Sequence, residues 1–455
     1  MKKNYKYILL FIFFFISLTF IFNISRGDTF VNYGFSYAIK MGQIPYKDFN
    51  MVITPLSPII YSIGLIFFNN IITFYLEQSL LLTILFYYFD KLLGKKSILM
   101  LLCFCIPYPI AFSSCIFPGY NFLVLLLSIM FMYYFKNNKN DYLLGVILGL
   151  IFCTKQNIGI VLFIPTIYYL FKDKSKFMKM FIGYLIPIFI LLLYLIITGS
   201  LNYFINLCLL GLLDFNDSNN YIDIFCLVSF VLGIIYLICK IFKNRKNILL
   251  YYELLFGVVV FPIIDYYHVS LFLIIVVFSI IDSIEFNDRY YKHIIYFIFS
   301  ICVIWSFITY KYFNGITITN YNHFSLVINT KRYSDNSKKL MKYVNSLDKD
   351  VIYFMRGSEN YFYKISNNKK LDYFDLPNHG NYGYDGINMM KERIDNVNDV
   401  YFIIDSNLIN NSDIGQQYIK ELGKYVKKKS EKVEEIGVYE IYYKKSRWYY
   451  GYNKK

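Results

Sequence analysis

The sequence predicts a polytopic α-helical membrane protein with about 11 transmembrane helices, followed by a small α/β domain. Three observations support this prediction. Hydrophobic residues make up 57% of the chain, and the mean hydropathy is positive at +0.42. Long apolar runs separated by short lysine-rich breaks fill residues 1–313. Residues 314–455 are polar, and their apolar side chains follow the periods of helices and strands.

The net charge of +15 does not indicate a nucleic-acid-binding protein. Lysine and arginine gather in the breaks between apolar runs, as they do in cytoplasmic loops of membrane proteins. The eight cysteines lie in or beside apolar runs, and none has the paired spacing of a zinc site. We therefore expect membrane lipid around the helices, no nucleic acid partner and no disulfide in the polar tail.

Residues 1–23 resemble a signal peptide, but no small-x-small cleavage site follows them. We expect an uncleaved first span with a cytoplasmic N-terminus. Residues 53–69 are short for a span and contain two prolines, so we expect a helix at the membrane interface there. An eighth span is expected before Lys240, and a ninth and tenth on either side of Asp265. The other spans are expected at roughly 7–24, 71–90, 97–116, 120–135, 142–154, 157–171, 180–198 and 293–312.

With these spans, every lysine-rich break falls on one side of the membrane, which the positive-inside rule makes cytoplasmic. The polar tail then lies on the outer face of the cell membrane. Alternating helices and strands in the tail predict a small α/β domain. Its helices are expected at 334–347, 385–394 and 413–429, and its strands at 351–354, 400–404 and 437–443.

Five ionisable residues lie at span ends on the predicted outer side, namely Asp28, Asp48, Lys155, Asp265 and His268. Ionisable groups near membrane depth are costly and often functional. Each also has a structural interpretation. Asp28 could be an acid in the first turn of a helix with no chemical role. Asp48 could be a turn residue paired with Lys47.

Lys155 could be a lysine that extends to the lipid headgroups, or it could bind a phosphate. Asp265 and His268 are three residues apart, so they can share a helical face with the carboxylate orienting the imidazole. Their structural alternative is a polar cap on a short loop. The sequence contains no Walker loop, HExxH, GxSxG or Rossmann glycine pattern, so soluble-nucleotide chemistry is not expected.

The first outer loop, residues 25–58, resembles that of the GT-C superfamily of polytopic membrane glycosyltransferases. The similar branch is the bacterial one that contains protein O-mannosyltransferases and lipid A aminoarabinose transferases. The resemblance covers roughly the first 310 residues. It is carried by Gly27-Asp28-Thr29, Gly42-Gln43-Ile44-Pro45-Tyr46-Lys47-Asp48-Phe49 and Pro55-Leu56-Ser57-Pro58, with weaker matches at Tyr120-Asn121, Thr154-Lys155, Pro262, Asp265 and His268.

The resemblance implies inverting transfer of a sugar from a polyprenyl-phosphate donor to a glycan, lipid or protein acceptor of the cell envelope. It implies that Asp28 is the general base, with Asp48 as a possible second acid. The donor phosphate would be bound by Lys155 with Arg26 or His268. Asp265, Tyr120 and Asn121 would support these residues.

Many relatives carry a second acid before the fourth span, but residues 113–121 contain none. No metal ligand or cofactor is therefore assigned, and a divalent metal stays an open alternative. Three other functions stay open. An envelope polysaccharide polymerase or ligase typically has its large charged loop later in the chain, whereas a transporter or flippase would bury charges mid-span. A membrane anchor for the tail would leave the first-loop residues without a role.

Overall fold

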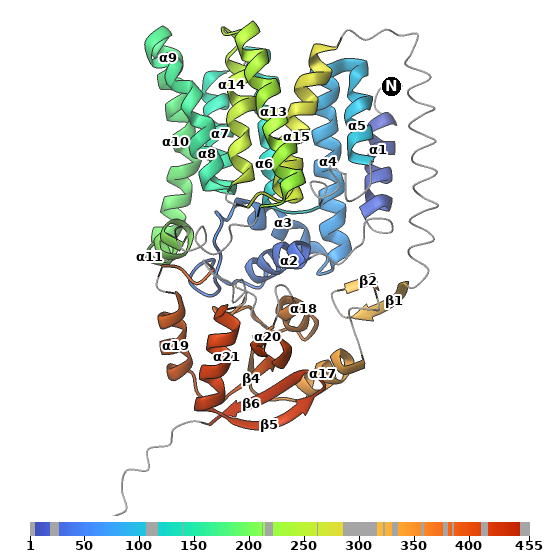
Figure 1. The fold of residues 1–455 in the computed structure, drawn as a ribbon, viewed down its shortest axis with the longest axis vertical. Coiled ribbons are helices and arrows are strands. Elements are labelled where there is room, and N and C mark those ends of the chain that lie inside the picture. Colours follow the sequence, from blue (N-terminus) through green and yellow to red (C-terminus); the bar gives the residue numbers. More distant parts are fainter. Residues whose placement is uncertain are drawn as a thin grey trace, which may run out of the picture.

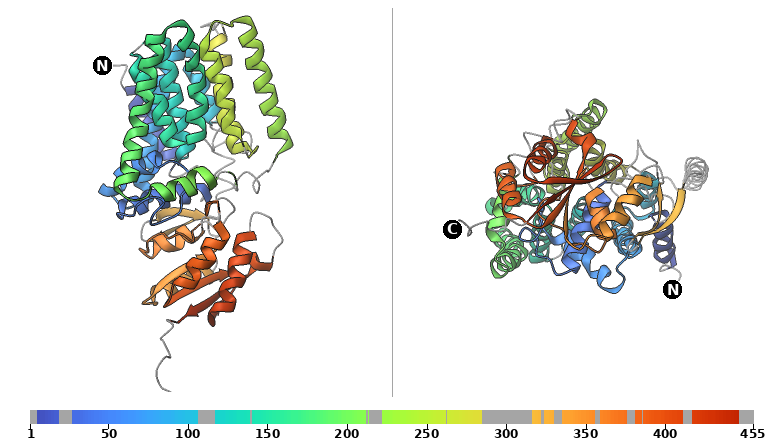
Figure 2. Two further views of the ribbon diagram at one scale, coloured as in Figure 1. Left: turned by 90° about the vertical axis from the view of Figure 1, so that its left-hand side faces the viewer. Right: turned by 90° about the horizontal axis from the view of Figure 1, so that it is seen from below.

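The computed structural model shows a helical bundle and a smaller domain containing a sheet, with helices α2 (Gly27–Lys40) and α3 (Leu56–Phe67) between them (Figure 1). The left view of Figure 2 gives the same order from another side. The structure describes residues 5–18, 27–105, 117–138, 140–211, 213, 222–261, 263–284, 316–321, 324–329, 335–355, 359–375, 381–384, 386–410 and 417–445.

The bundle is built from apolar helices, several of which begin at a side-chain cap. Asn70, Asn140, Asp173, Asp223, Asn247 and Asp265 each accept a hydrogen bond from a backbone N–H in the first helical turn. Such caps satisfy donors that have no partner inside the helix. The bundle helices are α1 (Tyr5–Ile16), α4 (Ile71–Leu93), α5 (Ser97–Cys105), α6 (Tyr120–Lys136), α7 (Asp141–Thr154), α8 (Gln156–Phe163), α9 (Ile167–Lys172), α10 (Lys174–Ile197), α13 (Ile224–Lys243), α14 (Ile248–Leu255) and α15 (Tyr266–Ser283).

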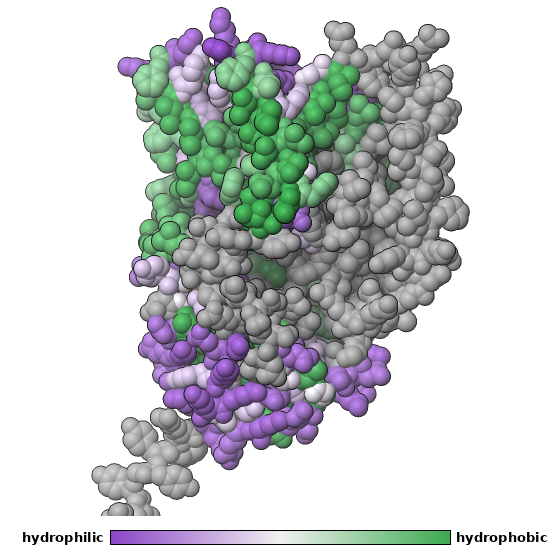
Figure 3. Space-filling model, in the orientation of Figure 1, coloured by the Kyte–Doolittle hydropathy of each residue, from purple (hydrophilic) through white to green (hydrophobic). Residues whose placement is uncertain are grey.

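Within the described residues, three helical segments are long and apolar enough to cross a membrane, namely Ile71–Leu101, Lys174–Ile197 and Ile224–Lys243. The other apolar helices are shorter. The count of about 11 spans therefore stays a prediction. The predicted eleventh span at 293–312 lies outside the described residues. Below a polar rim, hydrophobic residues cover the described part of the visible bundle face (Figure 3), as a surrounding bilayer would require.

The lysine-rich breaks gather at the end of the bundle that is remote from the smaller domain (Figure 1). Ion pairs connect neighbouring breaks there, with Lys6 Nζ at 2.6 Å from Asp90 Oδ1 and Lys136 Nζ at 3.2 Å from Asp282 Oδ1. The starts of α6, α8 and α15 lie at the opposite end, nearest to α2 and α3. The lysine-rich breaks, which alternate with other loops along the sequence, thus lie together at one end of the bundle.

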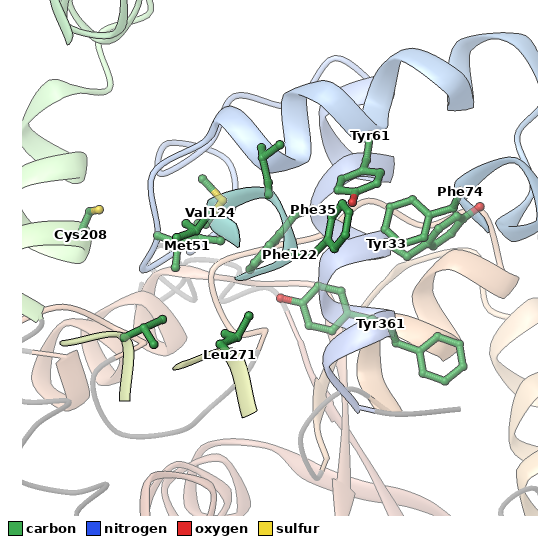
Figure 4. Packing of buried hydrophobic residues seen from close by; sticks show 14 of the residues in the cluster. Tyr33, Phe35, Met51, Tyr61, Phe74, Phe122, Val124, Cys208, Leu271 and Tyr361 are labelled. Atoms are coloured by element: carbon green, nitrogen blue, oxygen red, sulfur yellow. The ribbon is translucent and has the colours of Figure 1, made fainter. Parts of the chain in front are cut away.

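Aromatic side chains pack α2 and α3 against the bundle, and α2 against the smaller domain (Figure 4). On the bundle side, the rings of Tyr33 and Tyr61 lie 5.4 and 4.8 Å from the ring of Phe74 in α4. On the other side, the ring of Phe35 lies 5.9 Å from that of Tyr361 in the smaller domain. Tilted and edge-to-face rings at such distances pack favourably, so α2 contacts bundle and domain alike.

The smaller domain contains a four-stranded sheet with the order β3 (Asp350–Phe354), β4 (Val400–Asp405), β6 (Tyr439–Lys444) and β5 (Glu431–Ile436). β3 and β4 are parallel, and the other pairs are antiparallel. The view from below shows these strands beneath the bundle (Figure 2). Its helices are α17 (Asp335–Asn345), α18 (Glu359–Ser366), α19 (Gly386–Asn396), α20 (Ser406–Asn410) and α21 (Gln417–Lys429).

The predicted helices and strands of the tail lie close to α17, α19, α21, β3, β4 and β6. Five elements were not predicted, namely α18, α20, β5 and the antiparallel hairpin of β1 (Ile316–Tyr321) and β2 (Phe324–Asn329). β5 escaped prediction because its side chains are almost all exposed, so it lacks the apolar alternation of a half-buried strand.

Glycines allow α7 and α10 to approach closely. A Cβ atom added to Gly145 would lie 2.0 Å from the carbonyl oxygen of Met180, and one added to Gly149 would lie 2.4 Å from that of Tyr184. The two glycines are four residues apart, so they share one face of α7. Small residues at this spacing let helix backbones pack directly in membrane proteins.

Replacement Gly145→Ile should separate α7 from α10, because the added side chain collides with backbone that cannot move aside. We expect a loss of about 1–3 kcal/mol or more in the free energy of unfolding, measured by thermal unfolding in detergent. Leu143→Ile, on an exposed position of the same helix, is the control and should leave the unfolding temperature nearly unchanged. Equal stability of the two variants would contradict the close packing.

Candidate functional site

Lys155 lies in the turn between α7 and α8 with its side chain buried, at 9% exposure. Its Nζ donates a hydrogen bond to Asn121 Oδ1 at 3.1 Å and lies 5.3 Å from the centre of the Tyr120 ring. Among the described residues it forms no ion pair within 4.0 Å. The structure therefore brings three of the predicted residues together, at the start of α6 and the end of α7.

Burial lowers the pKa of Lys155 to about 8, and the nearby carboxylate of Asp265 raises it part of the way back. A buried ammonium is unfavourable unless it is paired and hydrogen-bonded. Here its partners are an amide oxygen, an aromatic face and a carboxylate farther than 4.0 Å away. This environment favours the binding of an anion beside Nζ.

Asp265 and His268 form the predicted pair at the start of α15. Asp265 Oδ1 accepts a hydrogen bond from the backbone N–H of His268 at 2.9 Å and lies 2.8 Å from Nδ1 of its ring. Burial alone would raise the pKa of Asp265, but the hydrogen bonds from His268 outweigh it and hold the pKa below its ordinary value. The carboxylate is thus both a helix cap and the group that orients the imidazole, so the two interpretations coexist.

The start of α2 approaches this cluster through Asn32. Gly119 precedes α6 with φ of +156°, and a Cβ atom there would lie 2.8 Å from Asn32 Nδ2. Only glycine adopts this backbone conformation readily and leaves room for the amide. Asp28 is the second residue of α2, one helical turn before Asn32. Arg26 and the side chain of Asp28 lie outside the described residues.

Asp48 lies in a compact, exposed turn. Its Oδ2 accepts a hydrogen bond from the backbone N–H of Ile44 at 2.7 Å, which supports the interpretation as a turn residue. Lys47 was expected to pair with Asp48, but its Nζ donates to the carbonyl of Thr198 at 3.2 Å. None of these contacts connects Asp48 to the residues around Lys155.

The first loop nevertheless passes directly beside Lys155. Thr54 Oγ1 donates a hydrogen bond to the carbonyl of Phe152 at 2.9 Å. The side-chain amide of Gln156 donates to the carbonyl of Val52 at 3.3 Å. Residues on both sides of Lys155 are therefore hydrogen-bonded to the loop that contains the family-like motifs.

Sequence reasoning missed a buried polar group at the lysine-rich end of the bundle. Ser279 Oγ donates to Glu253 Oε2 at 2.5 Å, and Lys240 Nζ donates to Ser279 Oγ at 2.8 Å. Lys240 and Glu253 line a cavity together with the ion pair of Lys136 and Asp282. The only sequence signal was a glutamate within an apolar run. Buried charges within the bundle are a feature expected of a transporter.

The negative charge of Asp265 should support the ammonium of Lys155. Asp265→Asn keeps the helix cap, so we expect little change in stability but a pKa of Lys155 clearly below 8, because the attraction is lost. Asp265→Ala removes the cap as well and should cost about 1 kcal/mol. The pH dependence of Lys155 acetylation, followed by mass spectrometry, measures this pKa. An unchanged pKa in Asp265→Asn would contradict the coupling.

The described residues contain no group of three or more His, Cys, Asp or Glu side chains that could hold a metal ion. The cluster combines a buried ammonium with an imidazole that a carboxylate orients, and Asn32 of α2 lies beside it. The ammonium and the imidazole can bind an anion. No protein-family model, curated protein or solved structure matches this chain.

Proposed function

We propose that this protein is an integral-membrane, inverting glycosyltransferase that moves a sugar from a polyprenyl-phosphate donor to a cell-envelope acceptor on the outer face. The observation that carries the proposal is the incompletely paired ammonium of Lys155. A lipid-linked phosphate would supply the missing negative charge. The apolar helices around this end of the bundle offer a place for the polyprenyl chain.

In the proposed reaction, Asp28 takes the proton of the acceptor hydroxyl while its oxygen attacks the anomeric carbon. The bond between that carbon and the phosphate oxygen breaks, and the electron pair leaves with the lipid phosphate. Attack from the opposite side inverts the configuration. Lys155 stabilises the charge that develops on the leaving phosphate.

The remaining residues have supporting roles in this proposal. His268, oriented by Asp265, faces the phosphate with its second ring nitrogen, and Arg26 is a further cation for it. Tyr120 and Asn121 hold the ammonium of Lys155 in place. Asp48 is kept as a possible second acid only by its position in the first loop, since its observed contact closes a turn.

Transport is a second candidate function, favoured by the Glu253–Ser279–Lys240 group within the bundle. Buried ionisable groups in helical bundles often relay protons or ions. Lys240 and Glu253 share a cavity with Lys136 and Asp282, at the ends of α6 and α15, whereas Lys155 contacts the start of α6. Each function can therefore be removed without touching the residues of the other.

Transfer of sugar from synthetic polyprenyl-phosphate donors to envelope acceptors tests the proposal. Asp28→Asn should lower kcat by about 10²–10⁴-fold, because an amide cannot accept the proton. Lys155→Met should also lower kcat, because the leaving phosphate loses its cation. Asp141→Asn, at the lysine-rich end, is the control and should keep wild-type activity. Full activity in a correctly folded Asp28→Asn variant would refute the assigned mechanism.

A further inference from the structure

The first loop is hydrogen-bonded to the smaller domain, which is the C-terminal domain, by two buried amide side chains. Gln43 Nε2 donates to the carbonyl of Leu371 at 2.8 Å, and its Oε1 accepts from the backbone N–H of Leu371 at 3.0 Å. Asn50 Nδ2 donates to the carbonyls of Asp375 and Asn381 at 2.6 and 3.1 Å. Both amides are at most 7% exposed, so the interface is well packed around them.

The segment that forms most of these bonds, residues 371–375, is held in place by ion pairs to Lys364. Lys364 Nζ lies 2.6 Å from Asp372 Oδ2 and 2.7 Å from Asp375 Oδ1. Asn360 Nδ2 also donates to Asp375 Oδ1 at 2.7 Å. These contacts restrain the carboxylates of Asp372 and Asp375. The carbonyl groups that face the loop are therefore held in fixed positions.

The same domain packs closely on α2. A Cβ atom added to Gly34 would lie 2.1 Å from Cδ1 of Tyr361, so only glycine leaves room for this ring. The rings of Phe30 and Phe362 lie 5.9 Å apart, one turn closer to the start of the helix. α18 thus covers the part of α2 that directly follows Asp28.

Residues 46–54 of the first loop are held by buried and hydrogen-bonded side chains. Tyr46 is fully buried, with φ of +68°, a conformation that is rare for a bulky residue and persists only where its surroundings fix it. Its hydroxyl donates to the carbonyl of Ile53 at 2.6 Å. The next residue, Thr54, bonds to Phe152 beside Lys155. A continuous set of contacts therefore runs from the C-terminal domain to the turn that carries Lys155.

We infer that the C-terminal domain is a positioning element for the Lys155 site, and that Gln43 and Asn50 are the positioning residues that couple the two. The domain fixes the start of α2, with Asp28, relative to the turn that carries Lys155. The catalytic consequence rests on the proposed function. Since small misplacements of reacting groups cost up to about 100-fold in rate, loss of this coupling should act on kcat.

The test uses the full chain with the double variant Gln43→Ala/Asn50→Ala. We expect kcat to fall at least about tenfold, with KM for the polyprenyl-phosphate donor changed less than about twofold, because Lys155 itself is untouched. Gln43→Ala alone keeps the bonds of Asn50, so its kcat should lie between those of wild type and the double variant. Asn398→Ala, an exposed amide of the same domain, is the control.

Hydrogen exchange provides a readout that does not depend on activity. In the double variant, exchange should become faster in residues 371–375, in the first turns of α2 and in residues 152–156 together. Faster exchange confined to the domain, or a wild-type kcat despite a loosened interface, would overturn the inference. If wild-type protein transfers no sugar, the proposed function fails, and the exchange of α2 and residues 152–156 still decides whether the domain positions them.

Discussion

The structure of the candidate site depends on the burial of the Lys155 ammonium. A charge removed from water must find partners, and the fold supplies them from the starts of two helices. The start of α6 provides Tyr120 and Asn121, and the start of α15 provides Asp265. Because no carboxylate among the described residues lies within 4.0 Å, the ammonium can still accept an anionic partner.

The first loop connects this site to the rest of the molecule. Its polar residues divide into two groups with different roles. Gln43, Asn50 and Thr54 hold backbone carbonyls of the domain and of α7, while Asp48 closes a turn. Much of the polarity that made the loop conspicuous is therefore structural. Asp28, at the start of α2, is the loop residue to which we assign the removal of the acceptor's proton.

Local sequence patterns predicted the helix caps and strands that depend only on nearby residues. The cap at Asp265, its spacing to His268 and the strands β3, β4 and β6 follow from short-range patterns. Contacts between distant segments were beyond such patterns, as in the bonds of Gln43 to Leu371 or of Ser279 to Glu253. The number of spans also stays open, because several apolar helices are shorter than a bilayer requires.

The most direct test is an experimental structure of the protein in lipid nanodiscs with a bound polyprenyl phosphate. Our account predicts a phosphate oxygen at about 2.8 Å from Lys155 Nζ, the usual length of a charge-assisted hydrogen bond. The polyprenyl chain should lie along the apolar surface of the adjacent helices. A phosphate bound instead in the cavity beside Lys240 and Glu253, with nothing at Lys155, would contradict it.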